Sequence, residues 1–70
     1  MTSDYAVLLG MRLKHTRQAS NLELPNAAER AGLPADSWQL WEGGEDQPDI
    51  DQFAKICRLL KPDIEWLMGG

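Results

Sequence analysis

The chain has few side chains suited to covalent or metal chemistry, and their spacing argues against both. Cys57 is the only cysteine and His15 the only histidine, so no intrachain disulfide forms and no second thiol or imidazole completes a metal-ligand set. No serine or cysteine has a base at a motif spacing, and no glycine-rich phosphate loop precedes a helix. We therefore expect no enzyme, metal or cofactor. We interpret Cys57 as a small core residue and His15 as a surface residue.

The charge balance argues against binding nucleic acid through bulk electrostatics. Eleven acids against seven Lys and Arg give a net charge of −4. Basic residues gather near the N-terminus, whereas acids dominate residues 44–51, GEDQPDID. That acidic stretch lacks the alternating ligand positions and the terminal Glu of an EF-hand calcium loop.

The length and overall composition indicate one small helical domain over residues 1–70. A chain this short buries only about 60% of the surface that its unfolded form exposes, so its stability depends on close helix packing. No apolar run approaches the roughly 18 residues of a membrane span. The first residues, MTSDYAVLL, include no basic n-region of a secretory signal. A lone cysteine suits a reducing compartment, and we expect a cytoplasmic protein without membrane contact.

Caps, prolines and glycines divide the chain into short helices. The expected helices cover residues 4–19, 25–31, 34–43, 49–60 and 64–68, with Ser3 or Asp4 and Asp63 as the caps of the first and last. Gly32 is a typical residue after a helix end. Asp49 and Gln52 have the spacing of a capping box, and Pro62 ends the fourth helix. No stretch alternates long enough for a strand, so the predicted class is all-α.

Helical periodicity predicts which apolar residues face the core. In the first helix, Val7 or Leu8 with Met11, and Leu9 with Leu13, have the spacing of a buried stripe. The stripe expected in the fourth helix consists of Ile50, Phe53, Ala54, Ile56, Cys57 and Leu60. Trp38 and Trp41, three residues apart, share one face of the third helix. We interpret the two tryptophans as core residues, not as a ligand box or a docking face.

The segment NAAERAGLPADSWQLWE is typical of a helix, a tight turn containing glycine, and a second helix. With MRLKHTRQASNL before it, WQLWEGG at its end and FAKICRLLKPDIEWLMGG after it, the sequence resembles the phage-repressor (Cro and Xre type) helix-turn-helix family over nearly its whole length. The resemblance implies a compact five-helix bundle, a lambda-repressor-like DNA-binding domain. Its helix-turn-helix unit would cover residues 24–43.

The same resemblance implies positions for a DNA interface. The helix at residues 34–43 would enter the major groove of double-stranded DNA. The slots that face bases hold Ala35, Asp36, Ser37, Gln39 and Leu40, and phosphate contacts are assigned first to Lys14 and Arg17, with Arg12, His15 and Lys61 as further candidates. Gln39 has the groups to read adenine. A structural pair between Arg17 and Glu42 is also implied, which would fix how the first and third helices meet.

The sequence departs from the family pattern around this face. Leu24 and Pro34 occupy slots that usually hold Gln and Ser or Thr. Acids fall on or near the expected DNA face, namely Glu23, Asp36, Glu45 and Asp46. Few phosphate contacts are therefore expected.

Two functions follow from these observations. The first is a sequence-specific, repressor-like transcriptional regulator of phage or bacterial type. It would bind DNA as a homodimer through the C-terminal helices, where Trp66, Leu67 and Met68 offer apolar area. For Trp66, packing within its own domain is an equal alternative. The second function is a protein-interaction module or antagonist with weak or no DNA binding, motivated by the acidic face and requiring a protein partner.

Overall fold

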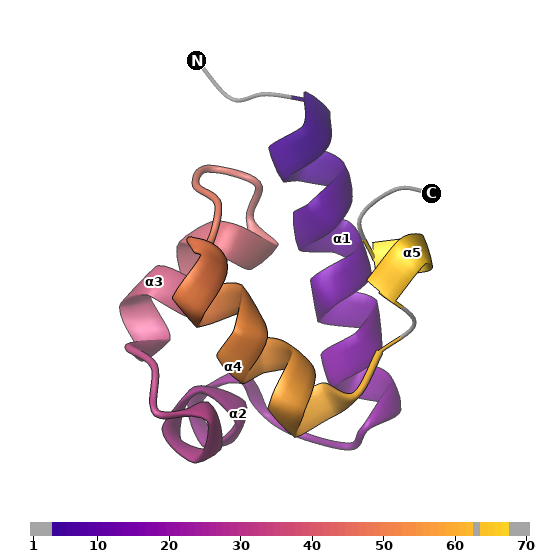
Figure 1. Cartoon of the computed structure of the whole chain (residues 1–70). Coiled ribbons are helices and arrows are strands. Elements are labelled where there is room, and N and C mark those ends of the chain that lie inside the picture. Colours follow the sequence, from indigo (N-terminus) through magenta and orange to yellow (C-terminus); the bar gives the residue numbers. More distant parts are fainter. Residues whose placement is uncertain (1–3, 63, 68–70) are drawn as a thin grey trace.

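The structure is a computed structural model that describes residues 4–62 and 64–67. Within these ranges it contains five α-helices and no strand (Figure 1): α1 Asp4–Ala19, α2 Leu24–Ala31, α3 Ala35–Glu42, α4 Ile50–Leu60 and α5 Ile64–Leu67. The predicted all-α class is confirmed, and the helix bounds agree closely with the expected ones. The expected caps Ser3 and Asp63, and Met68, lie outside the described residues.

The turn between α2 and α3 forms because of Gly32 and Pro34. Gly32 adopts a left-handed conformation with φ 74°, which a residue with a Cβ adopts only at a cost. Its N–H donates to the carbonyl of Glu29 at 3.1 Å, and the N–H of Leu33 donates to the carbonyl of Ala28 at 2.9 Å, which closes α2 with a Schellman motif. Extended Pro34 then precedes α3 directly. Two helices joined by this short turn form the helix-turn-helix unit.

The helix α4 begins at a side-chain capping box and ends at a residue with a left-handed backbone conformation. The Asp49 carboxylate accepts from the Gln52 backbone N–H, and the Gln52 side chain accepts from the Asp49 N–H, both at 2.8 Å. The predicted capping box is therefore confirmed. At the other end, Lys61 has φ 50° and donates its backbone N–H to Cys57, immediately before Pro62.

The core lies where α1, α2, α3 and α4 meet, and α5 covers it beside α1 (Figure 1). Trp38 and Trp41 are 0% and 2% exposed, so the prediction that both are core residues is confirmed. Their rings pack with centroids 6.2 Å apart. The buried apolar residues around them are Leu9, Leu13, Ala27, Ala28, Leu33, Ile56, Leu60 and Leu67. The Cα radius of gyration of 10.7 Å is close to the roughly 11 Å of a folded chain of this length.

Some of the expected apolar stripe is wrong. Leu9 and Leu13 are buried, whereas Met11 is 63% exposed, because residues 9 and 11 lie about 200° apart around a helix. On α4, Ile56 and Leu60 face the core, but Ile50 is 86% exposed and Ala54 is also exposed. Both helices bury a narrower arc than their apolar residues would allow.

Candidate nucleic-acid interface

The solvent side of α3 is a narrow ridge of polar and apolar side chains. Asp36 and Gln39 are exposed, and Leu40 is 40% exposed. These residues lie within an arc of about 100° on the helix, opposite the two buried tryptophans. Ala35 and Ser37 lie at the edges of this arc and are half-buried. The burial of Trp38 and Trp41 therefore determines which side chains α3 presents.

A buried ion pair ties this helix to α1. Arg17 Nε donates to Glu42 Oε2 at 2.6 Å and Arg17 Nη2 donates to Glu42 Oε1 at 2.9 Å, a bidentate arrangement. The two side chains are 9% and 6% exposed. The structure thus contains the pair that the family resemblance implies. Hydrogen bonding to Glu42 raises the pKa of Arg17, against the opposing effect of burial.

Two further groups complete the Arg17–Glu42 network, and the sequence interpretation missed both. Trp38 Nε1 donates to Glu42 Oε2 at 2.6 Å, and Arg17 Nη1 donates to the carbonyl oxygen of Leu22 at 2.7 Å. The four-residue spacing of Trp38 and Glu42 was the available signal, since such residues are neighbours on a helix. No buried side-chain nitrogen or oxygen among the described residues lacks a partner. Arg17 is therefore turned inward, and the structure offers no free Arg17 guanidinium to a phosphate.

Gly10 allows α1 to approach the end of α3. A Cβ at Gly10 would overlap the Trp41 carbonyl oxygen and lie 2.9 Å from that of Glu42. Real Cβ atoms do not sit this close to backbone, so any larger residue would push the two helices apart. Gly10 is not among the residues expected from the sequence to position the site. An unexplained glycine inside a helical pattern was its only signal.

An open depression next to the α3 ridge brings together predicted site residues from three helices. It has a volume of about 300 Å³, and it is lined by Lys14, Arg17, Leu24, Gln39, Glu42 and Gly43. Lys14 is exposed on α1, one helical turn before Arg17, so its ammonium group borders the same surface as Gln39. Leu24 and Pro25 begin α2 here, and Pro25 has no N–H to offer an anion.

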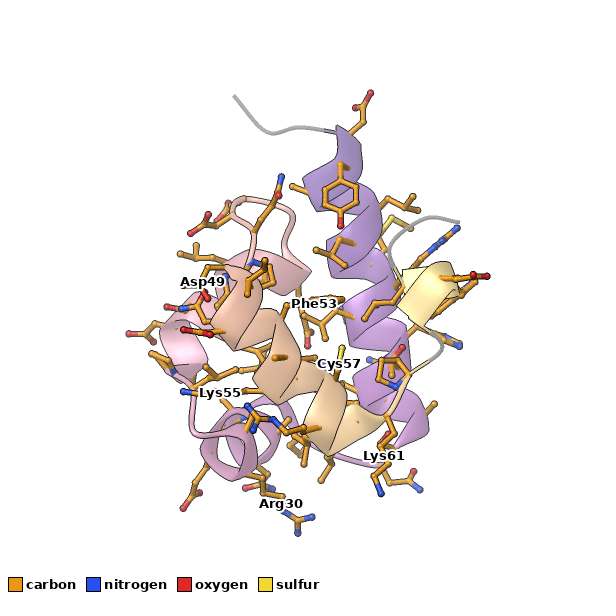
Figure 2. The ribbon with its side chains drawn as sticks, viewed as in Figure 1. Arg30, Asp49, Phe53, Lys55, Cys57 and Lys61 are labelled. Atoms are coloured by element: carbon orange, nitrogen blue, oxygen red, sulfur yellow. The ribbon has the colours of Figure 1, made fainter. Side chains whose placement is uncertain are left out.

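The other basic candidates on α1 face α5 instead of α3. The Arg12 guanidinium lies 5.1 Å from the Trp66 ring centroid and donates to the Trp66 carbonyl oxygen, and the His15 ring lies 5.7 Å from the Trp66 ring. Lys61 lies at the C-terminal end of α4 (Figure 2). Of the basic residues proposed for phosphate contact, Lys14 is therefore the one beside the α3 ridge.

The contacts of α5 revise the expected dimer surface. Leu67 is 1% exposed and belongs to the core of its own chain, so the expectation that it supplies dimer area is wrong. Trp66 is 37% exposed and packs against Arg12 and His15 of the same chain. Intramolecular packing, one of the two alternatives for Trp66, is thus present.

Acidic side chains flank the interface, as expected. Glu23, Asp36, Glu45 and Asp46 are all exposed.

In the described part of the chain, no three His, Cys, Asp or Glu residues are grouped so that they could hold a metal ion. None of the described helices has the length and hydropathy needed to cross a membrane.

Comparison with known proteins supports the fold. The crystal structure of the restriction-modification controller protein C.AhdI from Aeromonas hydrophila matches with a TM-score of 0.81 and 24% identity, over 89% of this chain and 94% of that chain. That of the clp gene regulator ClgR from C. glutamicum matches with a TM-score of 0.84 and 18% identity, over 97% of this chain and 87% of that chain. No curated protein matches the sequence.

A sequence family described as a helix-turn-helix domain matches residues 8–65. The match spans α2, α3 and α4, most of α1 and the first half of α5. The chain therefore belongs to the helix-turn-helix domain family, as its resemblance to the phage-repressor (Cro and Xre) type predicted.

Proposed function

We propose that the protein is a sequence-specific DNA-binding transcriptional regulator that places α3 in the major groove. The observation that carries the proposal is the exposed ridge of α3, backed by two buried tryptophans and joined to Lys14 by the depression. Membership of the helix-turn-helix domain family supports it. So does the likeness of its fold to a restriction-modification controller protein and a gene regulator.

In this proposal the site residues divide by chemistry. The Gln39 side-chain amide can donate to and accept from adenine at once, and such a bidentate contact discriminates by about 1–3 kcal/mol against the wrong base. Ser37 offers a hydroxyl, and Leu40 and Ala35 offer apolar contact with a thymine methyl group. Lys14 contacts a phosphate, and Arg17 positions α3 through Glu42. Asp36 can accept from a cytosine amino group, but its charge lowers affinity near phosphates.

The test starts from a duplex selected out of a random pool by the wild-type protein at low salt, with binding read by fluorescence anisotropy. Gln39→Ala should weaken binding to the selected duplex by about 10-fold or more, and much less to a scrambled duplex. Lys14→Ala should weaken both duplexes equally, because a phosphate contact carries no sequence information. Lys55→Ala, on α4, is the matched lysine control.

Two outcomes would contradict this function. One is a selection that enriches no sequence at about 1 μM protein, a concentration well above the dissociation constants typical of specific DNA binding. The other is an NMR titration in which a duplex shifts amides on α4 but not those of residues 34–40.

A second candidate is supported by the acids around the ridge. Asp36 lies one helical turn before half-exposed Leu40, and the Glu45 N–H donates to the Leu40 carbonyl oxygen, with exposed Asp46 next in the chain. Exposed acids near an apolar side chain fit a basic protein partner better than a polyanion. Under this alternative the helix-turn-helix fold is a protein-interaction module or an antagonist. It predicts that a stoichiometric protein is captured from the native host, and that the capture fails for Asp36→Lys but not for Gln39→Ala.

Repression and homodimerisation are finer parts of the proposal. A dimer would double the phosphate contacts, which are few in one copy. Leu67 is buried and Glu65 is charged, so Trp66 is the described apolar side chain of α5 that could contribute to such a contact. Trp66→Ala should then lower both dimer formation and DNA affinity in analytical ultracentrifugation and anisotropy experiments.

A further inference from the structure

Charge is segregated along the second half of the chain. Residues 31–54 contain six acids and no Lys or Arg, whereas residues 55–61 contain three basic residues and no acid. We define the acidic loop by its exposed carboxylates Glu45, Asp46, Asp49 and Asp51, and the basic surface by Arg30, Lys55, Arg58 and Lys61. Each set therefore carries four charges, of opposite sign.

The acidic loop lies at the start of α4, and the basic surface runs from the middle of α4 to its C-terminal end and onto α2. Figure 2 shows Asp49 at the start of α4, Lys55 near its middle, Lys61 at its C-terminal end and Arg30 on the adjoining α2. All four basic residues are exposed, and none of their side chains forms an ion pair or hydrogen bond with a described residue. Glu29, next to Arg30 on α2, reduces the positive charge of this surface only in part.

Helix dipoles account for some of this pattern but not for all of it. Arg30 and Arg58 lie in the last turns of α2 and α4, and Asp51 lies in the first turn of α4, where each sign is favourable. Glu45 and Asp46 precede the helix, and Lys55 lies in its middle. The dipoles do not account for these three charges, whereas Lys61, the C-cap of α4, lies where a cation is favourable.

We propose that the basic surface binds the acidic loop of a second copy of this chain. The occupant is argued from charge complementarity, because the same molecule supplies an equal number of exposed charges of opposite sign at a separate place. Each contact joins the acidic loop of one copy to the basic surface of another, either reciprocally in a pair or head to tail with one surface of each copy left open. It differs from a two-fold dimer through α5, and it does not involve the α3 ridge.

Salt and concentration should govern this association. Both surfaces are exposed, so their attraction is screened over about 8 Å at physiological ionic strength and over about 30 Å at 0.01 M salt. The contact therefore forms at high protein concentration and low salt. It should weaken at least about tenfold when salt rises to about 0.3 M, as long-range attraction between exposed charges is lost.

A charge-swap experiment tests the proposal without DNA. One variant is Lys55→Glu/Arg58→Glu, which neutralises the basic surface and leaves the acidic loop intact. The other is Glu45→Lys/Asp46→Lys, which neutralises the acidic loop and leaves the basic surface intact. Sedimentation equilibrium follows the wild type, each variant and their equal mixture at about 1 mM protein and low salt, where screening is weakest. Circular dichroism verifies that each variant is folded.

The wild type should associate, each variant alone should be monomeric, and the mixture should associate again. Net charge alone does not give this result: the first variant has −4 − 4 = −8 and the second −4 + 4 = 0, and a neutral partner offers no net attraction. Concentration-dependent amide shifts in the wild type should fall in residues 45–51 and 55–61.

Several results would overturn the inference. One is a wild type that stays monomeric. Another is a self-association whose strength is unchanged by salt and by both pairs of substitutions. A third is a mixture of the two folded variants that stays monomeric. Amide shifts at Lys55 and Arg58 on addition of a DNA duplex, without self-association, would assign the basic surface to nucleic-acid phosphates instead. The proposed DNA-binding function stands or falls separately, since no arm of the charge-swap experiment contains DNA.

Discussion

At the scale of the residue, one carboxylate organises the candidate interface. Glu42 accepts two hydrogen bonds from Arg17 and one from the Trp38 indole, with little exposure to water. A buried pair of this kind adds little net stability relative to an apolar pair, but removing one partner strands the other charge. Its importance here is positional, because it holds the end of α3 against α1.

We predict that Glu42→Gln destabilises the protein by about 3 kcal/mol, because Arg17 would keep its charge in a buried site without a counter-charge. Urea unfolding followed by circular dichroism measures the loss as a lower midpoint at unchanged slope. The control Glu29→Gln, at an exposed position, should change stability by less than about 0.5 kcal/mol. A loss below about 1 kcal/mol would show that the pair behaves like an exposed surface pair.

Cys57 gives a prediction about pH. Its side chain is half-buried on α4, and desolvation raises the pKa of its thiol. The folded state therefore holds the thiol proton at a pH where the unfolded chain releases it. Stability from this group is intact below the ordinary thiol pKa and declines as pH rises above about 8.5.

Alkylation by iodoacetamide at about pH 8.5 should thus be slower for native Cys57 than for the same thiol in urea, since the thiolate is the reactive form. Equal rates in the two states would contradict the raised pKa. The substitution Cys57→Ser should abolish modification altogether, which confirms that the signal comes from this residue.

At the scale of the element, the crossing of α1 and α3 sets the direction of the ridge. Gly10 brings the α1 backbone against the Trp41 and Glu42 carbonyls, and Arg17 binds Glu42 two turns later on the same side of α1. Backbone contact and ion pair together fix the last turn of α3. The short Schellman turn at Gly32 fixes the other end of α3 relative to α2.

Gly10→Ala should therefore destabilise the protein by about 1–3 kcal/mol through overpacking. This direction opposes helix propensity, since alanine is better than glycine inside a helix by about 1 kcal/mol. Gly43→Ala is the control: its φ is −78°, and an added Cβ would lie 3.3 Å from the Gln39 carbonyl oxygen. This contact is tight but does not overlap as at Gly10, so a smaller effect is expected. Thermal unfolding of both variants and the wild type measures these changes in stability. A Gly10→Ala variant more stable than the wild type would contradict the close approach.

At the scale of the whole molecule, charge placement limits how DNA can be held. The net charge is −4, Arg17 is used internally, Arg12 packs on Trp66, and Lys14 is the basic residue beside the ridge. In the proposed complex, a monomer would therefore make few phosphate contacts. Its specificity would come chiefly from base edges contacted by α3.

The salt dependence of DNA binding should accordingly be shallow. With one or two phosphate contacts per copy, log affinity should fall with log salt at a slope of about −1 to −2. Raising salt from 50 to 200 mM should then weaken binding by about 4- to 16-fold. Anisotropy titrations at several salt concentrations measure the slope. Lys14→Ala should reduce it by about 0.9. A slope steeper than about −5 would show that basic residues outside the ridge contact the DNA.

Local signals in the sequence determined the helices and the burial of Trp38 and Trp41. Gly32, Pro34 and Pro62 each lie at a boundary between helices. The Asp49–Gln52 capping box depends on a three-residue spacing. The spacing of Trp38 and Trp41 placed both rings on one face, and their size makes burial favourable. These features depend on neighbours within a few residues, so the sequence suffices to predict them.

Only the tertiary structure decided which faces meet. Met11 and Ile50 are as apolar as the core residues, yet packing of α1 on α3 and of α4 on α2 leaves both exposed. The contacts of Trp66 with Arg12 and His15, and the close approach at Gly10, join residues distant in sequence. Periodicity gives the direction of each side chain around its own helix axis. How two helices rotate against each other depends on all the packed side chains at once.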